Sequence, residues 1–489
     1  MSKKYLAAAA LLALTSTAVA QAQPSCSGQP VQYEIAYLGG TDFTVTAEFP
    51  ASAGLVDLSW RSSESAPDGQ AEFISQLELR DLEGRWQTPT YLGEGSWQPV
   101  EGADAEYDAL RYRLSATHDR VVWDIGKEEI AYRFDEAFYF IGSSVLIANY
   151  GWSDCRYEVD FDLPASWSSV AAWEGSEDGG YHTTSLNDLL RNIFVVGPNL
   201  EPQAMNLGGM EVVTLSQRAL EPAAAQFQSL LGDSVSRYIE IFGSSPVDRY
   251  LAVFGVDGAN DGGAFAQSFG QRMPAPLREY ERLMWTRTLA HESLHNWIGI
   301  TIRPESGSEL QWFTEGGADY LTGKTLYRIG EIDEDDMIFI LEGQVRRFLL
   351  GRIASGPISL AEAGVEKQRN RQLVYGGGAL FHLFLDAEMT ANQGAGSYEA
   401  LLRQLYENAD EPYSFDRMMT ALDAASDGSA SEIYGFLNGP FNPFAVLDRM
   451  TEIGLPTAAF GPDELLVRFA ANGCTGSREA ACMPGYLAR

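Results

Sequence analysis

The feature that most constrains this chain is the pentad His291-Glu292-Ser293-Leu294-His295, in which two histidines lie four positions apart. On an α-helix, such positions lie one above the other on the same face. Two imidazoles placed in this way can bind one zinc ion, and the glutamate between them can act as a general base. The chain has only 5 histidines, so its composition rarely produces this pattern by chance. The pentad therefore predicts a metal-binding helix.

The residues around the pentad favour a helix. Residues 281–298 contain neither glycine nor proline, and their apolar side chains recur near helical spacing. Gly299 follows as a C-terminal stop signal. The alternative is an amphipathic core helix in which both histidines are satisfied by hydrogen bonds.

A third metal ligand is expected in the segment 310–323, LQWFTEGGADYLTG. A catalytic zinc site takes three protein ligands and leaves a fourth position for water. Thr314 or a neighbour can cap a new helix, which would direct Glu315 toward the first helix. Asp319 would share that face and accept the free ring N–H of His291. The alternatives are a glutamate favoured by the helix dipole and a solvated surface aspartate.

These stretches resemble the gluzincin metallopeptidases, most closely the glycyl aminopeptidase family and more distantly the leucyl and alanyl aminopeptidase family. The residues that match are HESLHNW, TIRP and WFTEGGADYLTG. The resemblance implies one zinc ion per chain, bound by His291, His295 and Glu315, with Glu292 as the base. It also implies a peptide or protein substrate that is hydrolysed by a metal-activated water.

A downstream stretch is interpreted through the same resemblance. Residues 374–381, VYGGGALF, are similar to the family's Tyr-x-x-Gly-Ala-Leu segment at the start of a helix. The resemblance implies that Tyr375 donates its hydroxyl to the developing oxyanion. A tyrosine at the start of a helix, without a role in the reaction, is the alternative.

An edge strand ahead of the zinc helix matches the family less well. In the family, a glycine-rich strand binds the substrate backbone, and a glutamate in it binds the free amino terminus. The resemblance implies substrate contacts at Gly262, Gly263 and Ala264. The glutamate position holds Phe265 or Ala266 instead. Aminopeptidase action and cleavage of internal bonds therefore both stay open.

The order of the patterns predicts a multidomain α+β fold. Residues 21–195 contain short alternating or β-branched runs and are expected to form an all-β domain. Residues 196–332 have the strand and helix order of a thermolysin-like catalytic part with the zinc site. Residues 333–445 are mostly helical and are expected to close the cleft. Residues 446–489 form a C-terminal tail.

The N-terminus is typical of an exported protein. Residues 1–20 have two lysines, a short apolar stretch and an Ala-Val-Ala cleavage site, as a signal peptide does. No later run approaches the roughly 20 apolar residues that a membrane span needs. The expected location is the periplasm or the exterior of a bacterium.

The 4 cysteines are Cys26, Cys155, Cys474 and Cys482. An even number in an oxidising compartment favours disulfides, and three connectivities are open. Cys474 and Cys482 enclose a short loop, so we expect them to pair with each other and Cys26 to pair with Cys155.

The strongly acidic composition excludes one class of partner. The formal net charge is −33, whereas binding of nucleic acid needs a basic patch. The oligomeric state stays open. Two other functions compete with a peptidase: a binding protein on an inactive peptidase fold, and a zinc amidase or esterase that uses the same site.

Overall fold

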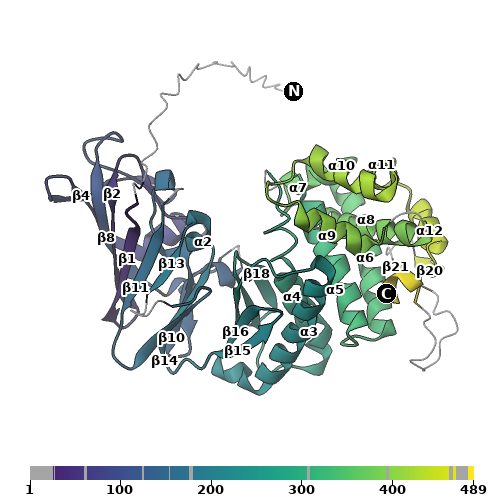
Figure 1. Cartoon of the computed structure of the whole chain (residues 1–489), viewed down its shortest axis with the longest axis horizontal. Helices are drawn as coiled ribbons and strands as arrows, with labels where there is room; N and C mark the ends of the chain where they lie inside the picture. The colour runs from purple at the N-terminus through teal and green to yellow at the C-terminus, as the bar shows by residue number, and fades with distance from the viewer. Residues whose placement is uncertain are drawn as a thin grey trace, which may run out of the picture.

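The computed structural model describes residues 26, 28–59, 63–123, 126–152, 155–175, 180–305, 309–392, 396–461, 466–469 and 483–488. An N-terminal region built from β-sheets is followed by a sheet with helices and then by a helical C-terminal half (Figure 1). The predicted multidomain α+β fold is therefore confirmed. Among the described residues, no helix is both long enough and apolar enough to cross a membrane.

Two large sheets form most of the N-terminal region. The larger has the strand order β13-β11-β1-β2-β8-β4-β5, and the smaller has the order β12-β14-β10-β9. Alternate residues of β1 are buried at its start because successive side chains of a strand point to opposite faces. The larger sheet contains β1 (Val31–Gly39), β2 (Asp42–Ser52), β4 (Ile74–Asp81), β5 (Trp86–Gln87), β8 (Tyr107–Ser115), β11 (Tyr157–Asp162) and β13 (Tyr181–Thr183). The smaller contains β9 (Tyr132–Phe134), β10 (Ala137–Ile141), β12 (Trp167–Ala171) and β14 (Ile193–Pro198).

A third large sheet has the order β15-β16-β17-β19-β18 and is called the catalytic sheet below, because it lies in the part of the chain predicted to be catalytic. Its strands are β15 (Gln203–Leu207), β16 (Met210–Ser216), β17 (Arg249–Val256), β18 (Asp261–Ala264) and β19 (Ser268–Met273). β18 is an edge strand, paired with β19 on one side only. The domain boundary predicted near residue 195 falls inside β14 of the preceding sheet.

The smaller N-terminal sheet is buried on both faces. Phe138 and Phe140 of β10 pack in the core that this sheet shares with the larger one. Tyr139 of β10 packs on the opposite side, in a core that includes Leu251 and Val253 of β17. The N-terminal region and the catalytic sheet are therefore joined by a continuous apolar layer.

The helices that surround the predicted site follow the catalytic sheet. They are α3 (Ala224–Phe242), α4 (Arg282–Leu294), η7 (Trp312–Gly316), α5 (Gly317–Arg328), α6 (Glu334–Ser355), α7 (Leu360–Val365) and α8 (Arg371–Ala391). Further helices complete the C-terminal half: α9 (Tyr398–Glu407), α10 (Phe415–Ser426), α11 (Ser429–Asn438) and α12 (Pro443–Glu452). One apolar core extends from the catalytic sheet through these helices.

A disulfide ties the N-terminal arm to its own region. It joins Cys26 to Cys155, whose Cα atoms are 5.3 Å apart, and both residues are buried. Disulfides of this kind are typical of exported proteins. The pairing predicted for Cys474 and Cys482 lies outside the described residues.

Candidate metal centre

α4 carries both histidines of the pentad on one face. The Nε2 atoms of His291 and His295 are 3.0 Å apart. The helix ends at Leu294, earlier than the predicted range of 281–298, because the chain turns back there. Nδ1 of His295 donates to the carbonyl oxygen of Ile298 over 3.0 Å, and Gly299 adopts a φ of 109°. This turn holds the ring of His295 with Nε2 toward His291.

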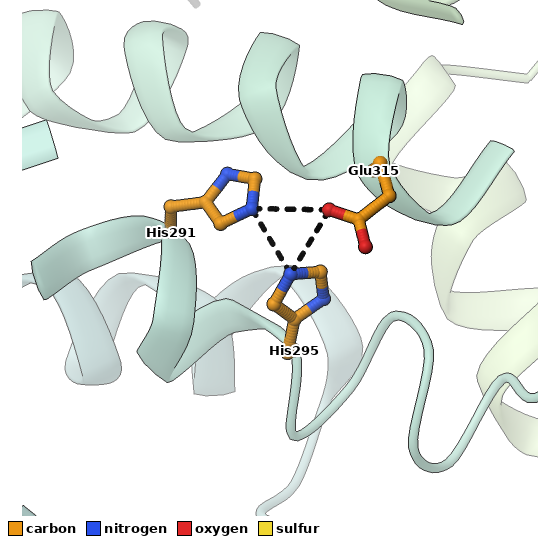
Figure 2. A group of neighbouring side chains, drawn as sticks. All are labelled: His291, His295 and Glu315. Atoms are coloured by element: carbon orange, nitrogen blue, oxygen red, sulfur yellow. Dashed lines mark hydrogen bonds and ion pairs between the residues drawn. The ribbon is translucent and has the colours of Figure 1, made fainter. Parts of the chain in front are cut away.

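Glu315 completes a triangle with the two histidines. It lies in η7, a π-helical turn that continues directly into α5, so Thr314 is inside the turn and does not cap it. Oε2 of Glu315 is 3.5 Å from Nε2 of His291 and 3.6 Å from Nε2 of His295. Figure 2 shows the three side chains converging.

The triangle fits a zinc ion. Two ligand atoms on a tetrahedral zinc ion lie about 3.3 Å apart when each bond is about 2.0–2.1 Å long. The observed separations are 3.0, 3.5 and 3.6 Å. Two imidazoles and one carboxylate also form a ligand set that zinc prefers. Within the described residues, this is the one group of three His, Cys, Asp or Glu side chains close enough to share an ion.

Asp319 binds the far side of the His291 ring. Its Oδ1 atom is 3.1 Å from Nδ1 of His291, and its Oδ2 accepts from Arg347 over 2.8 Å. Burial opposes ionisation of Asp319, but the hydrogen bond with His291 and the nearby arginines hold the pKa of Asp319 well below its usual range. Burial also lowers the pKa of His291, yet Asp319 and Glu315 outweigh it and raise that pKa to about 10.

Glu292 lies beside the histidines and packs against Gly262 of β18. A Cβ atom at Gly262 would come within 2.9 Å of Cγ of Glu292, so a glycine is needed for the strand to lie this close to α4. Burial raises the pKa of Glu292, and His291 and His295 act in the opposite direction. The strand residues predicted to contact substrate therefore lie beside the predicted base.

Tyr375 stacks on His291. The two ring centroids are 6.3 Å apart with an angle of 19° between the rings, and the tyrosine is 9% exposed. α8 begins one turn before Tyr375, so the glycines that follow lie inside the helix and not at its start. A Cβ atom at Gly378 would lie 1.9 Å from the carbonyl oxygen of Trp312. Each glycine costs the helix about 1 kcal/mol. Gly378 lets α8 pack directly against the turn that carries Glu315, whereas Gly376 and Gly377 face α6 and α7.

One buried carboxylate at this site was not predicted from the sequence. Glu128 comes from the short helix η3 (Lys127–Glu129) of the N-terminal region and is 4% exposed. A Cβ atom at Gly263 would come within 2.7 Å of its Cγ atom. Its Oε2 atom has no hydrogen-bond partner among the described residues. Burial, followed by the negative charges of Asp261 and Glu292, raises the pKa of Glu128 to about 8.

The contact of Lys367 with the site was also not predicted from the sequence. Its ammonium group pairs with Oε1 of Glu315, the oxygen that points away from the two histidines. Lys367 lies between α7 and α8, and no local pattern in this segment indicates such a contact. The pairing of Lys367 with Glu315 could be recognised only in the folded structure.

No protein-family model and no curated protein matches the chain. An aminopeptidase N family protein from Idiomarina loihiensis is similar in structure, with a TM-score of 0.72 and 17% identity over 88% of this chain and 80% of that one.

Two further solved structures share the fold. An M1 zinc metallopeptidase from Deinococcus radiodurans has a TM-score of 0.55 and 15% identity, over 86% of this chain and 97% of that one. A variant of a two-domain M1 zinc metallopeptidase bound to L-arginine has a TM-score of 0.53 and 17% identity, over 84% and 93%. This chain therefore has the fold of M1 zinc metallopeptidases, and the resemblance seen in the motifs extends to the fold.

Proposed function

We propose that this protein is a zinc-dependent aminopeptidase. The observation that carries the proposal is the triangle of His291, His295 and Glu315 with Glu292 beside it. When bound there, zinc supplies Lewis-acid chemistry that polarises the scissile carbonyl and makes water more acidic. Glu292 accepts a proton from the attacking water and delivers it to the leaving amine. Tyr375 donates its hydroxyl to the oxyanion.

Glu128 supports the choice of an aminopeptidase. The substrate backbone pairs with the free edge of β18, at Gly262, Gly263 and Ala264, as an added strand. A buried carboxylate without a hydrogen-bond partner is costly unless a ligand pairs with it. The free ammonium group of a peptide supplies that partner where Glu128 faces Gly263. Glu128 thus takes the place of the glutamate that is missing at Phe265 or Ala266.

Metal content and turnover of the purified protein test the proposal. We expect about one zinc per chain, loss of activity with a chelator and recovery on adding zinc. Alanyl peptides with a free amino terminus should be hydrolysed at least about tenfold faster than their acetylated forms, because a charge-assisted contact is lost. Equal rates on both would contradict the aminopeptidase assignment. Bound zinc without turnover on either would favour the binding-protein alternative.

Tyr375→Phe is expected to lower kcat by about 100-fold with little change in KM, since an oxyanion donor acts mainly in the transition state. Steady-state kinetics on a free-amino peptide would measure both constants. Tyr150→Phe is the matched control, because Tyr150 is 58% exposed and lies in the N-terminal region. An effect confined to KM would argue against oxyanion stabilisation by Tyr375.

A further inference from the structure

Three cations surround the ring of Tyr375. Cζ of Arg347 lies 4.6 Å from the ring centroid, and Nζ of Lys367 and Cζ of Arg371 each lie 5.6 Å from it. The chain as a whole has 34 Lys and Arg against 67 Asp and Glu, so this concentration of positive charge is unusual for it. Positive charges gathered around one ring repel one another, so we expect anions to balance them.

The carboxylates of the site balance only part of this charge. Lys367 pairs with Glu315, and Arg347 pairs with Asp319 at 2.8 Å. Arg371 is exposed and has no carboxylate partner within the described part of the chain. It is also the first residue of α8, where the helix dipole disfavours a cation. Arg371 is therefore available to an anion from outside the protein.

The cluster and Glu128 approach the metal triangle from different segments of the chain. Glu128 and Glu292 both approach β18, whereas Lys367 approaches Glu315 from the segment that precedes α8. In the view of Figure 1, α4 lies between β18 and α8. A substrate whose amino end pairs with Glu128 and whose scissile carbonyl reaches the triangle thus extends its leaving half toward the cations.

The leaving half has little distance to cover before it meets the cluster. One residue of extended chain spans at most about 3.6 Å. Because Lys367 directly contacts the third residue of the triangle, a carboxylate one or two residues beyond the scissile bond comes within reach of the cluster.

We infer that the site is selective for short peptides whose leaving half carries a carboxylate, above all di- and tripeptides with a free C-terminus. Arg371 and Lys367 bind that carboxylate, and Arg347 adds positive charge beside them. This inference rests on the proposed aminopeptidase function, because it places the amino end of the substrate at Glu128. An acidic side chain in the residue after the scissile bond supplies the same chemistry.

The test compares three dipeptide probes on the zinc-loaded protein: alanyl-alanine, its C-terminal amide, and alanyl-aspartic acid with an amidated α-carboxylate. We expect KM for the simple amide to be about tenfold higher than for alanyl-alanine, as a lost charge-assisted contact predicts. Arg371→Gln should raise KM about fivefold to tenfold for alanyl-alanine and less than twofold for the amide. The aspartyl probe shows whether the C-terminus or an acidic side chain is the preferred source of the carboxylate.

Arg369→Gln is the matched control, since Arg369 lies in the same segment but pairs with Glu366 and is 81% exposed. Arg369→Gln should change KM by less than twofold both for alanyl-alanine and for its amide. An equal effect of both variants, or equal KM values of the parent for acid and amide, would overturn the inference. The proposed function would survive these outcomes, because the amide would still be hydrolysed. Hydrolysis of none of the three probes would instead remove the proposed function and this inference together.

Binding gives a readout that does not depend on turnover. In a Glu292→Gln background, titration calorimetry with alanyl-alanine and with its amide should show about tenfold tighter binding of the free acid. Adding Arg371→Gln should abolish that difference. Equal affinities before the arginine is replaced would overturn the inference even if turnover is slow.

Discussion

Replacing Glu292 with glutamine is expected to lower kcat by about three orders of magnitude and to leave the zinc content unchanged. Glutamine keeps the size and polarity of the side chain but cannot accept a proton from water. The metal should stay bound because the converging atoms belong to His291, His295 and Glu315, not to Glu292. Metal analysis and steady-state rates on the same sample would measure both effects.

A control and a contrary outcome make this prediction specific. Glu279→Gln removes the same charge just before α4, where Glu279 has a 91% exposed side chain, and should change kcat by less than twofold. Turnover near the parental rate in Glu292→Gln would remove Glu292 from the role of base. Loss of zinc together with activity would mean that Glu292 supports the metal and not the proton transfer.

Replacing Glu128 with glutamine is expected to change which peptides are cleaved. The value of kcat/KM for peptides with a free amino terminus should fall about 10-fold to 100-fold, because an ion-paired hydrogen bond is lost. The value for acetylated peptides should change less than twofold, since those peptides carry no ammonium group. Competition between the two peptide forms in one reaction would measure the ratio directly. A uniform loss on both forms would contradict the role of Glu128 as an amine anchor.

The same variant should alter the dependence of stability on pH in the metal-free protein. The pKa of Glu128 is raised from 4.5 to about 8, so between these values the folded chain keeps a proton that the unfolded chain has released. The contribution of Glu128 to the free energy of unfolding is therefore fully present below pH 4.5. It is lost as the pH rises to about 8, by an amount on the order of a few kcal/mol. Glutamine removes this loss, so Glu128→Gln should melt at a higher temperature than the parent at pH 9 and at the same temperature at pH 4.5.

The control for the stability effect is Glu34→Gln. Glu34 is an exposed residue of β1, remote from the site, and its replacement should shift the melting curve equally little at both pH values. Parallel melting curves of the parent and Glu128→Gln across the whole pH range would contradict a protonated Glu128 in the folded state.

The local part of the site could be predicted from the sequence. Helical spacing alone places His291 above His295, and the short distance along the chain to Glu315 and Asp319 brings a second helix to the first. The order of strands and helices was enough to predict the overall architecture. Each of these features depends on residues close together in sequence, where backbone geometry fixes their relation.

The remaining features depend on contacts between distant segments. Glu128 reaches Gly263 from the short helix η3 of the N-terminal region, and Lys367 reaches Glu315 from the loop before α8. Neither residue is part of a local pattern, so only the packed tertiary structure reveals them. The early end of α4 has a local cause instead, because the turn at Ile298 holds the His295 ring. The resemblance placed residues 374–381 at the start of a helix, whereas their three glycines lie inside α8 and allow close packing against α6, α7 and η7.

The smaller N-terminal sheet, with apolar side chains on both of its faces, makes the N-terminal region inseparable from the sheet that contains β18. A chain shortened to begin after β14 would present one wall of a hydrophobic interior to water and would tend to aggregate. The same sheet holds Glu128, whose backbone carbonyl accepts a hydrogen bond from Tyr139 of β10, so the position of Glu128 beside β18 depends on this shared apolar layer.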